Sequence, residues 1–99
     1  MALVMDPAGD EIRALARVID WRDQHVLEVG CGDGRLTLRL ANLGAAEIVA
    51  FDPDPTLIRT ARRNLPQRLR PRIHYHVGHA EHVRQRAKRF EVVVFSWVL

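Results

Sequence analysis

The chain has 99 residues, which is enough for one small domain and too few for two. Its 15 basic and 12 acidic residues leave a formal net charge of +3, so charge alone does not demand a nucleic-acid partner. The single cysteine excludes an internal disulfide, and no apolar stretch has the length of a membrane span or the layout of a secretory signal; we therefore expect a cytoplasmic location.

The first predicted element is an amphipathic helix over residues 6–21. Asp6 can cap its N-terminus, and Pro7 suits the first helical position. Apolar residues then recur at the i, i+3, i+4 and i+7 spacing of one helix face, at Ile12, Leu15, Ala16 and Ile19. Residues 22–24 form a polar turn into the next element.

A strand, a glycine-rich turn and a helix follow over residues 26–44. Residues 26–29 are apolar apart from Glu28, and glycines come at alternate positions 30, 32 and 34. The apolar residues of the following helix are Leu36, Leu38, Leu40, Ala41 and Leu43, and Gly44 ends it. Glycine in such a turn lets the backbone N–H groups and the helix N-terminus come close to a ligand.

Three further strands alternate with two helices. Strands are predicted over residues 46–51, 72–77 and 90–95, and helices over residues 55–65 and 80–89. Asp54 is the expected cap of the first of these helices, and Pro55 its first residue. Such alternation predicts a three-layer α/β/α fold of the Rossmann-like kind. Its parallel sheet would have the strand order 3-2-1-4, counting the four strands from residue 26.

The stretch Leu-Glu-Val-Gly-Cys-Gly-Asp-Gly at residues 27–34 resembles the first motif of the class I S-adenosylmethionine-dependent methyltransferases, (D/E)-x-G-x-G-x-G. Asp52, at the end of the next strand, fits the same pattern. The resemblance implies a methyltransferase that binds S-adenosylmethionine (SAM). It covers nearly the whole chain but only the N-terminal, cofactor-binding half of the family fold, so residues 1–99 are expected to form one partial domain.

The resemblance also implies which residues hold the cofactor. Glu28 would anchor the loop that surrounds the methionine end, and the loop itself is formed by Gly30, Cys31, Gly32 and Gly34. Asp52 would bind the ribose, because its two oxygens can accept from two neighbouring hydroxyls. Pro53 would pack on the adenosine.

The adenine contact departs from the family pattern. The family often has Gly-Asp-Ala where this chain has Gly78-His79-Ala80. A neutral imidazole can still accept one hydrogen bond, so His79 and the backbone of Ala80 are the expected adenine contacts. Cys31 is interpreted as a small loop residue and not as a nucleophile. The resemblance names no catalytic residue and no methyl acceptor.

Other functions remain open at this point. A nicotinamide-dependent oxidoreductase would have the G-x-G-x-x-G fingerprint, but Arg35 stands where the third glycine belongs. A non-catalytic nucleoside-binding module and a truncated chain without its own activity are further alternatives. Histidines at 74, 76, 79 and 82 lack the spacing of a metal site, so no metal is expected.

Two surface features bear on partners. Six arginines between residues 59 and 72 could follow a phosphate backbone, but they lie away from the expected ligand and lack interleaved aromatic residues, so a solvated surface is favoured. In the family, three more strands come after the strand over residues 90–95. Here that strand would be an exposed edge, which could lead to self-association.

Overall fold

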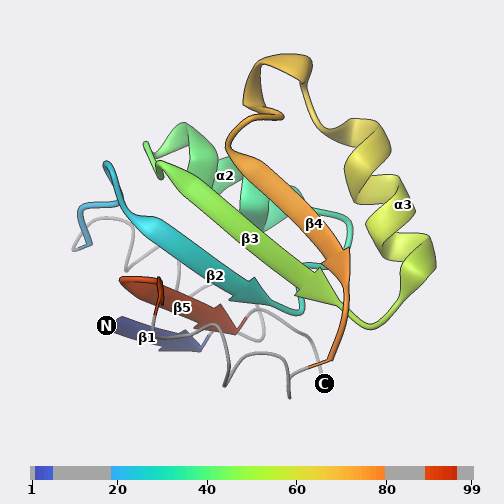
Figure 1. Cartoon of the computed structure of the whole chain (residues 1–99), viewed down its shortest axis with the longest axis horizontal. Helices are drawn as coiled ribbons and strands as arrows, with labels where there is room; N and C mark the ends of the chain where they lie inside the picture. The colour runs from blue at the N-terminus through green and yellow to red at the C-terminus, as the bar shows by residue number, and fades with distance from the viewer. Residues whose placement is uncertain (1, 6–18, 80–88, 96–99) are drawn as a thin grey trace.

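Every strand of the described chain belongs to one parallel sheet (Figure 1). The computed structural model describes residues 2–5, 19–79 and 89–95. The strand order is β1-β5-β2-β3-β4, and the strands are β1 (Ala2–Met5), β2 (His25–Val29), β3 (Glu47–Asp52), β4 (Ile73–Val77) and β5 (Val92–Phe95). The order of β2 to β5 confirms the predicted 3-2-1-4 arrangement.

The strand β1 is absent from the sequence prediction, and it corrects the expected exposed edge. It pairs with β5 in parallel, with Ala2 opposite Val92 and Met5 opposite Phe95. The strand β5 is therefore flanked on both sides, by β1 and by β2. Its backbone groups are already paired, so the prediction of self-association through this edge was wrong.

Two helices connect the central strands. The helix α2 (Arg35–Asn42) joins β2 to β3, and α3 (Pro55–Asn64) joins β3 to β4, followed by the short 3-10 helix η1 (Gln67–Leu69). Asp54 caps α3, since its side chain accepts a hydrogen bond from the Thr56 N–H at 2.8 Å, and Pro55 is the first residue of the helix. The predicted start of this helix is confirmed.

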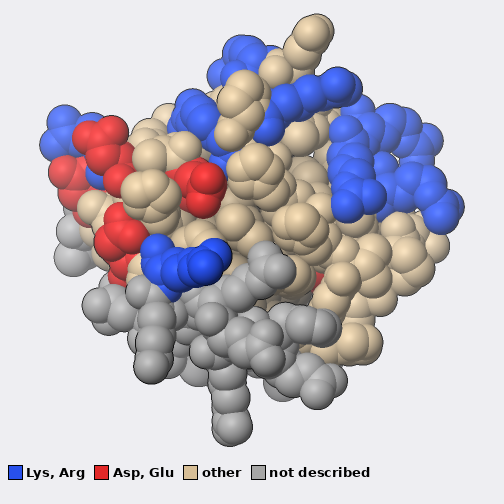
Figure 2. All heavy atoms as spheres, viewed as in Figure 1, with Lys and Arg blue, Asp and Glu red and all other residues tan. Residues whose placement is uncertain are grey.

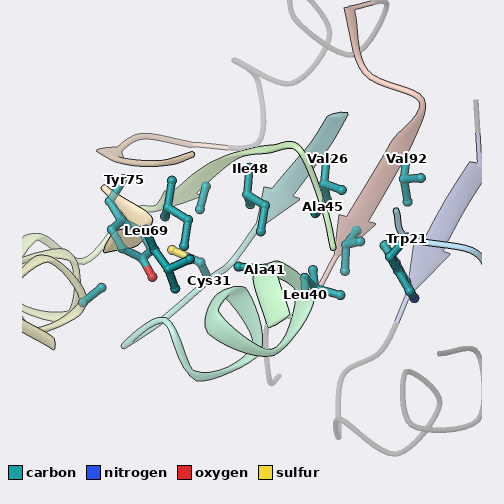
Figure 3. Close-up of a cluster of buried hydrophobic side chains, with 14 of the residues drawn as sticks. Trp21, Val26, Cys31, Leu40, Ala41, Ala45, Ile48, Leu69, Tyr75 and Val92 are labelled. Carbon is teal, nitrogen blue, oxygen red and sulfur yellow. The ribbon is translucent and has the colours of Figure 1, made fainter. Parts of the chain in front are cut away.

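Both helices pack on the same face of the sheet. Leu40 and Ala41 of α2 and Ile58 and Ala61 of α3 belong to one buried cluster (Figure 3), together with residues from β2 to β5 such as Ile48. Residues of the opposite face form a second buried cluster, made of Leu27, Val29, Val49, Phe51, Phe90 and Val93. The central strands β2, β3 and β5 are buried on both faces, as expected for a parallel sheet.

The predicted N-terminal helix is described only at its end. Residues 19–21 are not helical, so the prediction that the helix reaches Trp21 was wrong. Trp21 instead lies in the buried cluster beside α2, with 2% of its surface exposed (Figure 3). The rest of this helix, and the helix predicted over 80–89 up to residue 88, lie outside the described residues. No described helix has the length and apolar character needed to cross a membrane.

The N-terminal ends of β2 and β5 are joined by a side-chain pair. His25 Nδ1 lies 2.9 Å from Glu91 Oε1, and the same oxygen accepts from the His25 N–H at 3.1 Å. The hydrogen bond between the two side chains is the largest cause of the raised pKa of His25. The same hydrogen bond is the largest cause of the lowered pKa of Glu91. Both side chains are about half exposed, at 49% and 47%.

This pair makes a pH-dependent contribution to stability. The contribution is present when His25 is protonated and Glu91 ionised; it is lost as pH rises through the raised His25 pKa, and again as pH falls through the lowered Glu91 pKa. We expect an NMR titration to place the His25 pKa above its ordinary value of about 6.5, and Glu91→Gln to return it there. An unchanged His25 titration in E91Q would contradict the pairing.

Candidate functional site

The carboxyl ends of β2 and β3 bring the glycine turn and Asp52 together. The two strands pair in register, with Val29 opposite Phe51, so the segments that follow them emerge at one edge of the sheet. The Gly30 and Cys31 N–H groups both donate to the Phe51 carbonyl, at 2.7 and 3.0 Å. The turn thus bends over the end of β3, at the edge where parallel α/β sheets bind ligands.

Asp52 joins this turn to the segment that follows β3, with one carboxylate oxygen bonded to each. Oδ2 accepts from the Gly32 N–H at 2.9 Å, and Oδ1 accepts from the Asp54 N–H at 2.9 Å. The residue is 8% exposed. Each carboxylate oxygen can accept more than one hydrogen bond, so the group retains capacity for a further donor. Asp52 therefore points at the glycine turn, as the sequence predicts.

The glycines at 32 and 34 serve different physical purposes. Both have positive φ, +56° and +88°, which side chains rarely tolerate. A Cβ on Gly34 would lie 2.4 Å from the Tyr75 hydroxyl and 3.2 Å from the Ala61 Cβ, so packing alone requires glycine there. A Cβ on Gly32 would meet no atom of the described residues within 4 Å. At Gly32 the positive φ favours glycine, whereas packing against the described residues does not require it.

Glu28 lies beneath the turn and has no exposed surface. Its Oε1 accepts a hydrogen bond of 2.5 Å from the Thr37 hydroxyl, and Thr37 is also fully buried. A buried carboxylate needs such partners. Because Thr37 belongs to the first turn of α2, the bond fixes the start of this helix against β2. Glu28 is thus in a position to support the turn from below.

Tyr75 closes the same region from β4, and the sequence prediction did not include it. Tyr75 is 4% exposed, and its hydroxyl makes no hydrogen bond of good geometry with the described residues. Burial raises the pKa of Tyr75 to about 12. The Thr37 hydroxyl lies near the Tyr75 hydroxyl and acts to lower the pKa of Tyr75. Tyr75 is buried in β4, and nothing in the sequence indicates that its hydroxyl lies against Gly34.

Cys31 is a buried loop residue, 6% exposed. Desolvation by burial raises the pKa of its thiol far above the usual range, and the negative charges of Glu28 and Asp52 act in the same direction. A thiol that stays protonated is a poor nucleophile. The structure is therefore consistent with Cys31 as a small residue of the turn.

The residues predicted to contact adenine are only partly described. The Gly78 N–H donates to the Asp52 carbonyl at 3.1 Å, which ties the end of β4 to the end of β3. His79 follows this contact and is exposed, as is Pro53 after Asp52. Ala80 lies outside the described residues.

The described histidines do not gather into one cluster. His74 lies 3.8 Å from Glu47, and the ring of His76 lies 5.3 Å from that of Phe51. Within the described ranges, no group of three or more histidine, cysteine or acidic side chains could hold a metal ion. His82 lies outside those ranges.

The parallel sheet, the glycine turn over its carboxyl edge and the acidic residue on the next strand define a nucleotide-binding α/β domain of the Rossmann-like class. Residues 26–99 match a family model described as a methyltransferase domain. The chain belongs to this family, the class I SAM-dependent methyltransferases.

Known proteins similar to the chain are methyltransferases whose names state different methyl acceptors. The magnesium-protoporphyrin O-methyltransferase of Rhodobacter capsulatus is 45% identical over 53 residues, which is 54% of this chain and 23% of that protein. The ribosomal protein L11 methyltransferase of Heliobacterium modesticaldum is 43% identical over 54 residues, 54% of this chain and 17% of that protein. The chain thus spans less than a quarter of the length of these two relatives.

A solved structure supports the fold. The RNA methyltransferase of Salinibacter ruber, solved in complex with S-adenosyl-L-homocysteine, aligns with a TM-score of 0.74 at 21% identity. The alignment covers 88% of this chain and 57% of that one. At this identity the likeness concerns the fold alone.

Proposed function

We propose that this chain binds SAM at the carboxyl ends of β2 and β3, as the cofactor-binding half of a methyltransferase domain. The whole protein would transfer the methyl group to an acceptor. One observation carries the proposal: the Asp52 carboxylate accepts from the Gly32 N–H at 2.9 Å, and no described atom lies within 4 Å of the place where a Gly32 Cβ would lie. The carboxylate and the glycine backbone thus lie side by side, and the described residues leave room for a ligand beside Gly32.

Each predicted residue has a role in this arrangement. Asp52 would accept from the ribose hydroxyls, and the turn at Gly30, Cys31, Gly32 and Gly34 would lie against the methionine end. Pro53, His79 and Ala80 would border the adenosine. Glu28 would anchor the glycine turn without a contact at the surface, because its carboxylate is hydrogen-bonded to Thr37 and has no exposed surface.

This arrangement suits methyl transfer without an acid–base pair. SAM, when bound, supplies a methyl group on a sulfonium, which is a good leaving group. The chain's task is then to orient the cofactor and to exclude water from it. The buried, protonated Cys31 is in keeping with this, since no covalent intermediate is needed. We name no catalytic residue.

The acceptor is not part of the proposal. The relatives' names include a porphyrin and a ribosomal protein as acceptors, so family membership does not select one. The lone buried Cys31 suits the reducing cytoplasm, where we place the protein.

Calorimetric titration of the chain with S-adenosyl-L-homocysteine (SAH) and with NAD⁺ tests the proposal. We expect saturable heat with SAH and none with NAD⁺, because Arg35 stands in place of the third glycine of the dinucleotide fingerprint. Circular dichroism would establish that the titrated chain is folded. A folded chain that binds NAD⁺ better than SAH, or neither, would refute it.

A further inference from the structure

The arginines that follow the site along the chain form one continuous charged surface. Between residues 55 and 79 the sequence contains six arginines and no acidic residue. We define the arginine face as the five that are exposed: Arg59, Arg62, Arg63, Arg68 and Arg70. The sixth, Arg72, instead donates to the Ala41 and Ala45 carbonyls and serves the fold.

Most of the described acidic residues lie away from this surface, although Asp54 caps the N-terminus of α3. Figure 2 shows basic side chains over the side formed by α3 and the segment after it, whereas the acidic side chains visible in that view gather mainly on the opposite side. The arginines at 59, 62 and 63 are spaced i, i+3 and i+4 on α3 and so share one helix face. A segregated basic surface of this kind is an electrostatic footprint for an anionic partner.

The described acidic residues do not neutralise the arginine face. The ion pairs within the described ranges are Arg22–Asp20, Arg35–Asp33, His25–Glu91 and His74–Glu47, and none includes an arginine of the face. Arg62 donates to the Tyr75 carbonyl at 2.7 Å, which turns one guanidinium toward the edge strand β4. The guanidinium groups of the remaining four arginines make no hydrogen bond or ion pair with a described residue.

The chemistry of the face favours phosphates over lipid or protein partners. Its charged groups are all guanidinium, whose planar fork binds phosphate oxygens in pairs. Insertion into a membrane is disfavoured, because Ile58 and Ala61 of α3 are buried against the sheet and Leu57 is the one large apolar side chain that the helix exposes. The face also lacks the exposed aromatic residues that anchor protein interfaces and that stack on unpaired bases.

We propose that the arginine face binds the phosphate backbone of a double-stranded nucleic acid, without reading its sequence. The helix α3 has 10 residues and is therefore about 15 Å long, which corresponds to about four phosphates along one strand of a duplex. The sequence favoured a solvated surface because the arginines lie away from the cofactor; the charge separation in the structure favours a polyanion instead. The proposal does not depend on cofactor binding.

Fluorescence anisotropy with a labelled 20-base-pair RNA duplex, titrated with the full chain at several salt concentrations, tests this proposal. We expect a log–log salt slope of about −3 to −4, one unit for each phosphate contacted. The double variant Arg59→Gln/Arg63→Gln should bind about tenfold more weakly, with a slope shallower by about 2. A DNA duplex of the same sequence should bind similarly, because the face has no group that selects the 2′-hydroxyl.

The matched control is Arg22→Gln/Arg35→Gln, which removes the same formal charge from arginines that Asp20 and Asp33 already neutralise. It should bind RNA like the unmodified chain. Polyglutamate and phosphatidylserine vesicles should not compete. Absence of duplex binding at 50 mM salt, equal losses in both double variants, or equal competition by polyglutamate or vesicles would each overturn the proposal. None of these outcomes bears on SAH binding, which is measured separately.

Discussion

Alanine at Gly34 should destabilise the fold strongly, whereas alanine at Gly32 should leave a folded chain that no longer binds the cofactor. The two positions lie in the same turn and both have positive φ, which costs alanine about 1–2 kcal/mol at either one. Only at Gly34 does the new Cβ collide with the core, 2.4 Å from the Tyr75 hydroxyl. Overpacking adds about 1–3 kcal/mol there, for a total loss of about 2–5 kcal/mol.

Urea unfolding of the two variants measures the difference in stability, and calorimetry with SAH measures binding. Gly34→Ala in a Tyr75→Phe background is a useful control, because removal of the hydroxyl relieves the closest contact and leaves the ring carbon at 3.1 Å. We expect partial recovery of stability. If Gly32→Ala bound SAH as well as the unmodified chain does, the open space beside Gly32 would not be the cofactor site.

Replacing Asp52 by asparagine should weaken cofactor binding by one to two orders of magnitude. The two carboxylate oxygens of Asp52 accept from the Gly32 and Asp54 N–H groups, each at 2.9 Å. An amide has one oxygen in place of two, so one of the two backbone N–H groups loses its acceptor. The ribose hydroxyls also lose the charged carboxylate as their acceptor. A hydrogen bond to a charged group contributes about 1.5–3 kcal/mol, which corresponds to about 10- to 150-fold in affinity.

Asp54→Asn is the matched control for this variant. It removes the same charge two residues away, at an exposed side chain whose role is to cap α3. Asparagine is as good an N-cap as aspartate, so stability and SAH affinity should both stay close to those of the unmodified chain. Calorimetry would contradict the ribose role of Asp52 if Asp52→Asn and Asp54→Asn bound SAH equally well.

The central fold could be predicted from local patterns. The apolar strands, the glycine turn and the Asp54-Pro55 cap each depend on neighbouring residues, and alternation of strand and helix then fixes the order of β2 to β5. The strand β1 was missed because four apolar residues at a chain end carry no periodicity, and its pairing with β5 joins residues 90 apart in sequence.

Part of the site could be predicted, because the order of the parallel strands determines which segments meet at their carboxyl ends. Gly32 and Asp52 follow adjacent parallel strands, so their approach can be inferred from the sequence, and the structure places them 2.9 Å apart through the Gly32 N–H. The contacts of Thr37 with Glu28 and of Tyr75 with Gly34 depend on side-chain packing between elements. Such packing does not follow from the spacing of residues in the sequence, so these two contacts could not be predicted. The run of arginines without acidic residues is visible in the sequence, but which of them share one surface becomes clear only once the chain is folded (Figure 2).

The most direct measurement of the central claim is the backbone amide NMR spectrum of the chain as SAH is added. If the ligand lies between the glycine turn and Asp52, the largest shifts will fall on the amides of Gly30, Cys31, Gly32 and Asp52, while those near the His25–Glu91 pair at the opposite edge of the sheet will stay in place. A folded chain whose spectrum is unchanged by SAH, or whose shifts centre on that opposite edge, would contradict the assignment of the site.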